Sequence, residues 1–157
     1  MTSQISRAAF AMGLVLLSGC ASGSMAEVLH QRHEGHGSTG TYAVPVARAW
    51  EITETILRWD GAGTIEEHRD GNFLLTTIYN PRVVQGIDPT TYIGAWIEPA
   101  SGDQVKLTCV VSGSKVSTTY TENDFQRRFQ QAIELTKDGQ RLPDAAPPRP
   151  RQAYAGH

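Results

Sequence analysis

The sequence is poor in cysteine, has no marked excess of charge of either sign, and has no apolar run long enough to cross a membrane. Fourteen Lys and Arg face 16 Asp and Glu, a net charge of −2, which gives no reason to expect nucleic-acid binding. A membrane-spanning helix needs about 20 apolar residues, and the longest apolar stretch, residues 8–17, is shorter. We therefore expect neither a nucleic-acid-binding protein nor a protein with a membrane-spanning helix.

Short catalytic motifs are also missing. The chain has no Gly-x-Ser-x-Gly elbow, no His-Glu-x-x-His zinc motif and no phosphate-binding loop. The local sequence thus points to no enzyme and no cofactor, although one sequence leaves open a triad assembled from distant residues.

The two cysteines need separate interpretations. If Cys20 is modified, Cys109 has no partner within the chain, and a lone thiol in an oxidising compartment is safest when buried. Alternating apolar residues place Cys109 on the inner face of a strand with Val105, Leu107 and Val111. The alternative is a reactive or intermolecular thiol.

What is present at the N-terminus is an export signal, residues 1–19. Arg7 precedes a short apolar core, residues 8–17, and small residues follow. The next run, Leu17-Ser18-Gly19-Cys20, resembles the lipobox of bacterial lipoproteins. That resemblance implies lipidation of Cys20, cleavage just before it, and membrane attachment by several acyl chains. Ala21 rather than Asp follows the cysteine, which in that family favours the periplasmic face of the outer membrane over the inner membrane.

The remainder of the chain divides into three parts by composition. Residues 20–39, rich in His, Gly and Ser, predict a flexible tether. Residues 40–138 carry the periodic apolar patterns of one folded domain. Residues 139–157 are rich in proline and poor in large apolar side chains, which predicts a disordered tail.

Within the domain, apolar spacing predicts two amphipathic helices, one from Pro45 to about Trp59 and one after a capping box at Thr121. Between them lie two hairpins. The first turns at Asp70-Gly71, a dipeptide that suits a two-residue type I′ turn, and the second turns at residues 99–103. Their strands are expected at residues 64–69, 72–79, 91–98 and 104–112, after a short strand at 41–44.

The expected fold is therefore α+β: an antiparallel sheet of four to five strands with two helices on one face, in the order strand-helix-strand-strand-strand-strand-helix. Several runs resemble a family of small bacterial lipoproteins of unknown function, whose helix-grip-like sheet is distantly similar to the domains of BamC, a lipoprotein of the outer-membrane assembly machinery. The resemblance covers roughly residues 41–137, and it implies a fold and a compartment rather than a reaction, with Trp50, Phe125 and Phe129 as core anchors. The runs that carry it are Val44-Pro45-Val46-Ala47-Arg48-Ala49-Trp50, the turn with Gly61, Thr91-Tyr92-Ile93-Gly94-Ala95-Trp96-Ile97-Glu98-Pro99 and Asp124-Phe125-Gln126-Arg127-Arg128-Phe129.

Two candidate sites follow. His30, His33 and His36 recur every three residues around Glu34, so they can be ligands for zinc or copper; the alternative is a soluble His-rich tether. Tyr92 and Trp96 share one side of a strand. That side is either covered by a loop or the tail, or exposed as a binding surface for a partner.

Two further clusters of charged residues are weaker candidates for a functional site. Residues 66–70 combine carboxylates with His68, but Glu66 and Glu67 lie on opposite faces of a strand, so we favour a solvated hairpin tip over acid–base chemistry. Arg141, Arg149 and Arg151 in the tail can contact lipid headgroups, lipopolysaccharide or peptidoglycan; the favoured alternative is a solvated tail.

The function predicted from these observations is that of a membrane-anchored periplasmic lipoprotein, not an enzyme. We expect it to act as an accessory or docking module for an envelope protein. The alternative is a carrier or sensor of a small ligand or metal ion, which would bind at the His tether or in the groove between sheet and helices.

Overall fold

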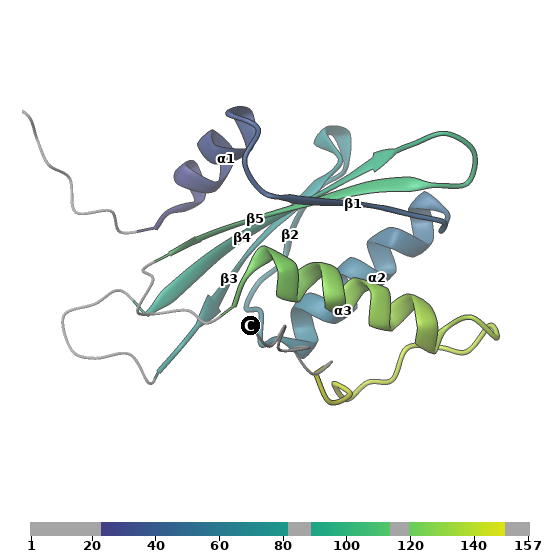
Figure 1. The fold of residues 1–157 in the computed structure, drawn as a ribbon. Helices are drawn as coiled ribbons and strands as arrows, with labels where there is room; N and C mark the ends of the chain where they lie inside the picture. Colours follow the sequence, from purple (N-terminus) through teal and green to yellow (C-terminus); the bar gives the residue numbers. More distant parts are fainter. Residues whose placement is uncertain (1–22, 82–88, 114–119, 150–157) are drawn as a thin grey trace, which may run out of the picture.

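The computed structural model describes residues 23–81, 89–113 and 120–149. The predicted export signal, Cys20 and Arg151 lie outside these ranges. The described residues form an α+β fold with one antiparallel sheet in the order β1-β5-β4-β3-β2 (Figure 1). The strands are β1 (Ser38–Tyr42), β2 (Glu66–His68), β3 (Phe73–Tyr79), β4 (Thr90–Pro99) and β5 (Val105–Gly113), and the helices are α1 (Met25–His33), α2 (Val46–Trp59) and α3 (Glu122–Leu135).

The predicted pair of helices lies on one face of the sheet. In Figure 1, α2 and α3 lie below the strands, while α1 lies above them. Inward-facing residues of β4, among them Ile93 and Ile97, pack with Phe125 and Phe129 of α3 in the main core, and all four are fully buried. Trp50 is buried there too, so the core role expected for the three aromatic residues is confirmed.

Local sequence accounts for the N-terminal end of α3. The Thr121 side chain accepts a hydrogen bond from the Asp124 backbone N–H, and the Asp124 carboxylate accepts one from the Thr121 backbone N–H. This is the predicted capping box, which satisfies two N–H groups that the helix leaves unpaired.

Cys109 is fully buried on β5, as the strand pattern predicts.

The turn expected at Asp70-Gly71 is wrong in detail. A 3₁₀ turn spans Arg69–Gly71, and Asn72 adopts the left-handed region with φ of 57°. Asparagine tolerates that conformation better than most residues, so the extra turn is accommodated while β2 and β3 stay paired.

The segment expected to be a flexible tether, residues 20–39, is instead ordered where the structure describes it. Ser24 caps α1 by accepting from the Glu27 N–H at 3.0 Å, and β1 pairs with β5 from Ser38 onward. The composition of this segment did not predict a helix, because Val28 is the only residue of α1 that is fully buried and the apolar pattern is therefore weak.

The tail expected to be disordered, residues 139–157, is also ordered through residue 149. Leu142 packs against the main core, and side chains of α2 and α3 hold the carbonyl groups of Pro143 and Pro147. These contacts supply the stabilisation that a proline-rich segment lacks by itself. In the part of the chain that is described, no helix combines the length and apolarity needed to cross a membrane.

Candidate functional site

The aromatic face of β4 is covered by α1. Trp96 is only 8% exposed, and it packs with Val28, Leu75 and Val110 in a second, smaller core. Tyr92 is half-buried at its margin. Of the two possibilities for the side that Tyr92 and Trp96 share, the structure shows the covered one, and the cover is a helix in the supposed tether rather than a loop or the tail.

Polar contacts attach the C-terminal end of α1 to the sheet. The guanidinium carbon of Arg32 lies 5.4 Å from the centre of the Trp96 ring, and Arg32 Nη2 lies 3.1 Å from Glu98 Oε2. Arg32 thus combines a cation–π contact with an ion pair on β4. With one buried valine and this arginine as its main attachments, α1 completes the domain and leaves its outer face to solvent.

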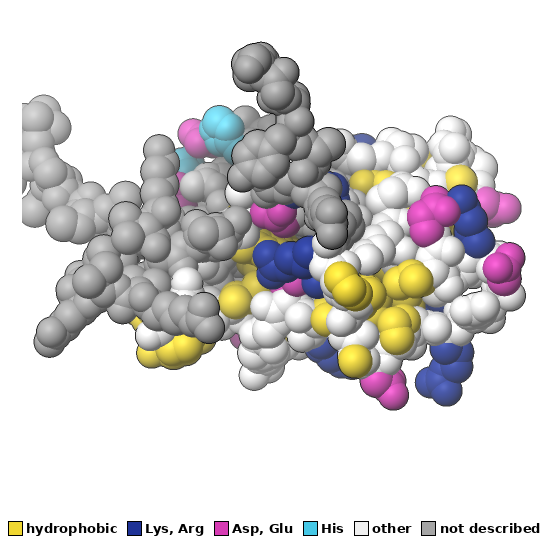
Figure 2. Space-filling model, turned by 60° about the horizontal axis from the view of Figure 1, so that its bottom comes forward, with side chains coloured by type: hydrophobic (Ala, Val, Ile, Leu, Met, Phe, Trp, Pro, Cys, Tyr) yellow, Lys and Arg dark blue, Asp and Glu magenta, His cyan; other side chains and the backbone are white. Residues whose placement is uncertain are grey.

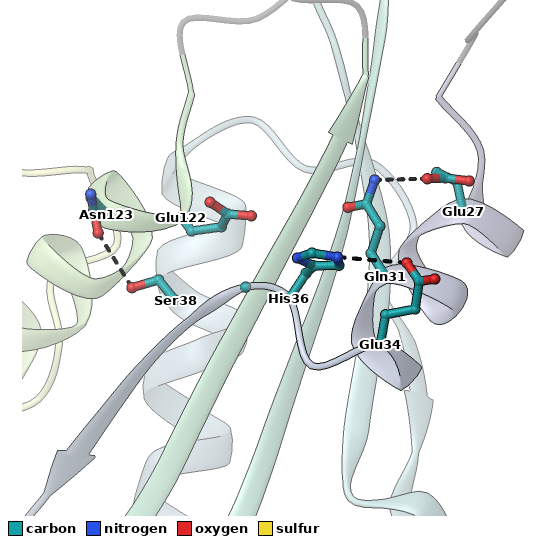
Figure 3. Close-up of a pocket in the computed structure, with 8 residues that line it drawn as sticks. Glu27, Gln31, Glu34, His36, Ser38, Glu122 and Asn123 are labelled. Atoms are coloured by element: carbon teal, nitrogen blue, oxygen red, sulfur yellow. Dashed lines mark hydrogen bonds and ion pairs between the residues drawn. The ribbon is translucent and has the colours of Figure 1, made fainter.

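A polar groove opens beside α1 (Figure 3). Its volume is about 680 Å³, and it lies between α1, the loop into β1 and the first residues of α3. We call it the acidic groove, and its lining residues are Glu27, Gln31, Glu34, His36, Gly37, Ser38, Glu122 and Asn123.

The charge of the acidic groove is one-sided. Three of its eight lining residues, Glu27, Glu34 and Glu122, are carboxylates, and none is Lys or Arg. Figure 3 shows Glu27 and Glu34 on the α1 side and Glu122 on the α3 side. Carboxylates that outnumber the basic side chains around them attract cationic groups, with which they make short, charge-assisted hydrogen bonds.

Several polar groups of the groove already form hydrogen bonds within it. Gln31 Nε2 donates to Glu27 Oε1 at 2.9 Å. Ser38 Oγ donates to Asn123 Oδ1 at 3.3 Å rather than to His36. The hydroxyl therefore lacks the aligned base that a nucleophilic serine requires.

The predicted histidine cluster is only partly brought together. Glu34 lies between two imidazoles, with its carboxylate 3.5 Å from His30 Nε2 and 3.6 Å from His36 Nε2. Across the described ranges, no group of three or more His, Cys, Asp or Glu side chains is arranged to hold a metal ion. The three-histidine ligand set is thus not assembled, and metal binding stays a prediction.

The carboxylate and histidine cluster at residues 66–70 lies at the edge of the sheet. Glu66 and His68 are exposed on β2, with 3.8 Å between carboxylate and imidazole, and the His68 ring stacks on Phe73 at 4.5 Å. Glu67 pairs with Arg69, whose hydrogen bond lowers the pKa of the carboxyl group. These are surface contacts around a turn, in accord with the solvated hairpin tip.

A buried charge cluster, which sequence reasoning missed, connects α2, α3 and the tail. The Asp60 side chain is completely buried, and its Oδ1 lies 3.5 Å from Arg128 Nε and 3.1 Å from Arg149 Nη2. Burial, together with the Asp60 carboxylate, raises the pKa of the Tyr120 phenol. The available signal was Arg128, a charged residue directly beside Phe129 on an amphipathic helix.

Comparison with known proteins adds no relative: no family model matches the chain, and no match was found among curated proteins. The resemblance to small lipoproteins with a BamC-like sheet therefore stays a prediction.

Proposed function

We propose that this chain is a lipid-anchored lipoprotein of the bacterial cell envelope, on the periplasmic face of the outer membrane. In this proposal it docks a basic segment of another envelope component and catalyses no reaction. The observation that carries the docking role is the acidic groove, which has three carboxylates and no lysine or arginine among its lining residues.

The anchor and the groove are close neighbours in the chain. Lipidation is expected at Cys20, and α1, whose residues line the groove, begins at Met25. Three residues lie between Cys20 and the helix cap at Ser24, so the four steps from one Cα atom to the next span at most about 14 Å when extended. A lipid at Cys20 therefore keeps the groove near the membrane surface, where it meets other membrane-associated proteins.

The chemistry of the groove supports binding rather than catalysis. Its hydroxyl, Ser38, is paired with an amide, and the carboxylate of Glu122 accepts the backbone N–H of Val111 at 3.3 Å. Glu34 is about half exposed, so its charge is available to a partner. Complementary charge of this kind raises association rates and selects partners.

The test is mild crosslinking and co-purification of the lipidated protein from its own envelope, compared across three variants. Glu34→Lys reverses a carboxylate in the acidic groove, while Glu66→Lys reverses an exposed carboxylate on β2, at the opposite edge of the sheet. Cys20→Ala removes the expected anchor.

We expect one envelope protein to crosslink to the wild type and to Glu66→Lys, and to be lost from Glu34→Lys. Equal recovery with Glu34→Lys and Glu66→Lys contradicts the role of the groove. Membrane fractionation of Cys20→Ala like that of the wild type contradicts the lipid anchor, independently of the groove.

A further inference from the structure

Residues 143–149, which we call the tail strap, run back across α2 and α3 (Figure 1). Three side chains of the helices donate hydrogen bonds to strap carbonyls, and all three acceptors belong to prolines. Trp59 Nε1 donates to Pro143 O at 3.0 Å, Arg128 Nη1 to Pro147 O at 2.8 Å, and Gln131 Nε2 to Pro148 O at 2.9 Å.

Folded domains bind proline-rich segments through contacts of this kind. Proline has a carbonyl but no N–H, and an extended proline-rich chain makes no internal hydrogen bonds, so its carbonyls are free to accept. Grooves that recognise such segments present aromatic side chains and polar donors. Trp59 supplies the aromatic donor here, and the strap supplies the carbonyls.

The two donors on α3 are held in position by each other. Arg128 and Gln131 lie three residues apart, and therefore side by side on the helix surface. Arg128 Nη1 also donates to Gln131 Oε1 at 2.9 Å. That bond turns the amide so that its nitrogen faces the strap.

The end of the strap is recognised by charge. Arg149 Nη2 lies 3.1 Å from Asp60 Oδ1, and the Arg149 guanidinium lies 5.7 Å from the centre of the Tyr120 ring. Asp60 caps the C-terminus of α2, where the helix dipole disfavours a negative charge. A buried carboxylate at that position is stabilised by nearby cations. The guanidinium of Arg128 lies 3.5 Å from it, and Arg149 brings a second positive charge closer, to 3.1 Å. Arginine is therefore the preferred side chain at the end of the strap.

The strap is held loosely for a segment with so many specific contacts. The Arg149 side chain is 52% exposed, and Pro143 and Pro148 are exposed as well. Figure 2, which brings this side of the molecule forward, shows Lys and Arg side chains among hydrophobic ones.

We propose that the surface formed by Trp59, Asp60, Tyr120, Arg128 and Gln131 is a receptor for a Pro-Pro-Arg segment of a partner protein. The chain's own tail strap occupies this receptor as an internal competitor. The proposal is independent of the lipid anchor and of the acidic groove, which lies against α1.

The test measures binding of a fluorescein-labelled peptide, Ala-Ala-Pro-Pro-Arg-Pro, to the full mature chain by fluorescence anisotropy. The proteins are the wild type and Arg149→Ala, which weakens the internal competitor without altering the receptor. A tethered competitor acts at an effective concentration in the millimolar range. We therefore expect Arg149→Ala to bind the peptide at least about tenfold more tightly than the wild type.

Two controls separate recognition from non-specific binding. The first control is a peptide with alanine in place of its arginine, which leaves the protein unchanged. We expect Arg149→Ala to bind this peptide no more tightly than the wild type does. Gln131→Ala, added to Arg149→Ala, is expected to weaken binding, whereas Gln130→Ala is not, because Gln130 Nε2 bonds to Glu134 on the exposed surface.

Equal affinity of the wild type and Arg149→Ala for the peptide overturns the proposal, as does equal binding of the arginine-free peptide. Light scattering tests whether the tail of a second copy of the chain occupies the receptor instead. A wild-type dimer that becomes monomeric in Arg149→Ala shows that the tail of a second copy fills the receptor, and overturns the assignment to a partner protein.

Discussion

The indole of Trp96 lies across Gly94, two residues earlier on the same face of β4. A Cβ atom added at position 94 would lie 2.6 Å from Cη2 and Cζ3 of Trp96, and 2.7 Å from Cγ1 of Val28 on α1. The absence of a side chain at Gly94 is thus what lets the tryptophan lie flat and the helix approach the sheet.

Gly94→Ala is expected to lower the free energy of unfolding by about 2 kcal/mol, because the added methyl group overpacks the small core. Urea denaturation measures the change. Gly63→Ala is the matched control, since its nearest non-local atoms would lie at an ordinary 3.7 Å. An equal effect of both substitutions would refute this account of Gly94.

Truncation of α1 side chains tests how the helix is attached. Val28→Ala is expected to cost about 1–3 kcal/mol, because Val28 is fully buried against the sheet and its loss leaves a cavity. Leu29→Ala removes a larger side chain, but Leu29 is 42% exposed, so a change within about 0.5 kcal/mol is expected. Chemical denaturation of both variants measures the two changes in the free energy of unfolding. A larger decrease for Leu29→Ala than for Val28→Ala would show that α1 packs through its other face.

Asp60→Asn is expected to cost about 3 kcal/mol, because it leaves the guanidinium of Arg128, 5% exposed, without its carboxylate. Asp103→Asn, in the exposed turn between β4 and β5, is the control and is expected to change stability little. Equal denaturation midpoints for the two variants would mean that the buried pair contributes nothing.

Stability is expected to fall in alkali through Cys109. Burial, with a smaller contribution from the Glu122 carboxylate, raises the pKa of this thiol well above its usual range. The unfolded chain loses the thiol proton above about pH 8.5 while the folded chain keeps it, so the free energy of unfolding falls by about 1.4 kcal/mol per pH unit.

The measurement compares unfolding free energies at pH 7 and pH 10 in a Cys20→Ala background. Below the unfolded pKa the contribution is constant, and above it the contribution is lost as pH rises. Cys109→Ala is expected to show a smaller loss between the two pH values. The same loss in both proteins would place the alkaline sensitivity elsewhere.

Sequence patterns predict the parts of this fold whose residues repeat regularly. The apolar stripes that bury Trp50 and Phe129, the capping box at Thr121, and the alternation along β4 and β5 each indicated the correct element. In these cases local preference and tertiary packing agree, which is why one sequence suffices.

The two elements that were missed are stabilised by distant contacts. Helix α1 has a single fully buried residue, Val28, and depends on Trp96 and Glu98, more than 60 residues away. The tail strap depends on Asp60 and Arg128. Composition correctly indicated that neither segment has a core of its own. It could not indicate that the body of the domain supplies one, nor that α1 is the element that covers Trp96.

The strand order also has a consequence for the timing of folding during synthesis. Among the described strands, β1 pairs with β5, so Thr39 finds its partner Thr108 only 69 residues later in the chain. A chain emerging from the ribosome cannot pair β1 until residue 109 is available, and it cannot complete β5, on which α1 packs, until residue 113 is available. Such long-range pairing slows folding, so β1 stays without its partner strand until most of the domain has been made.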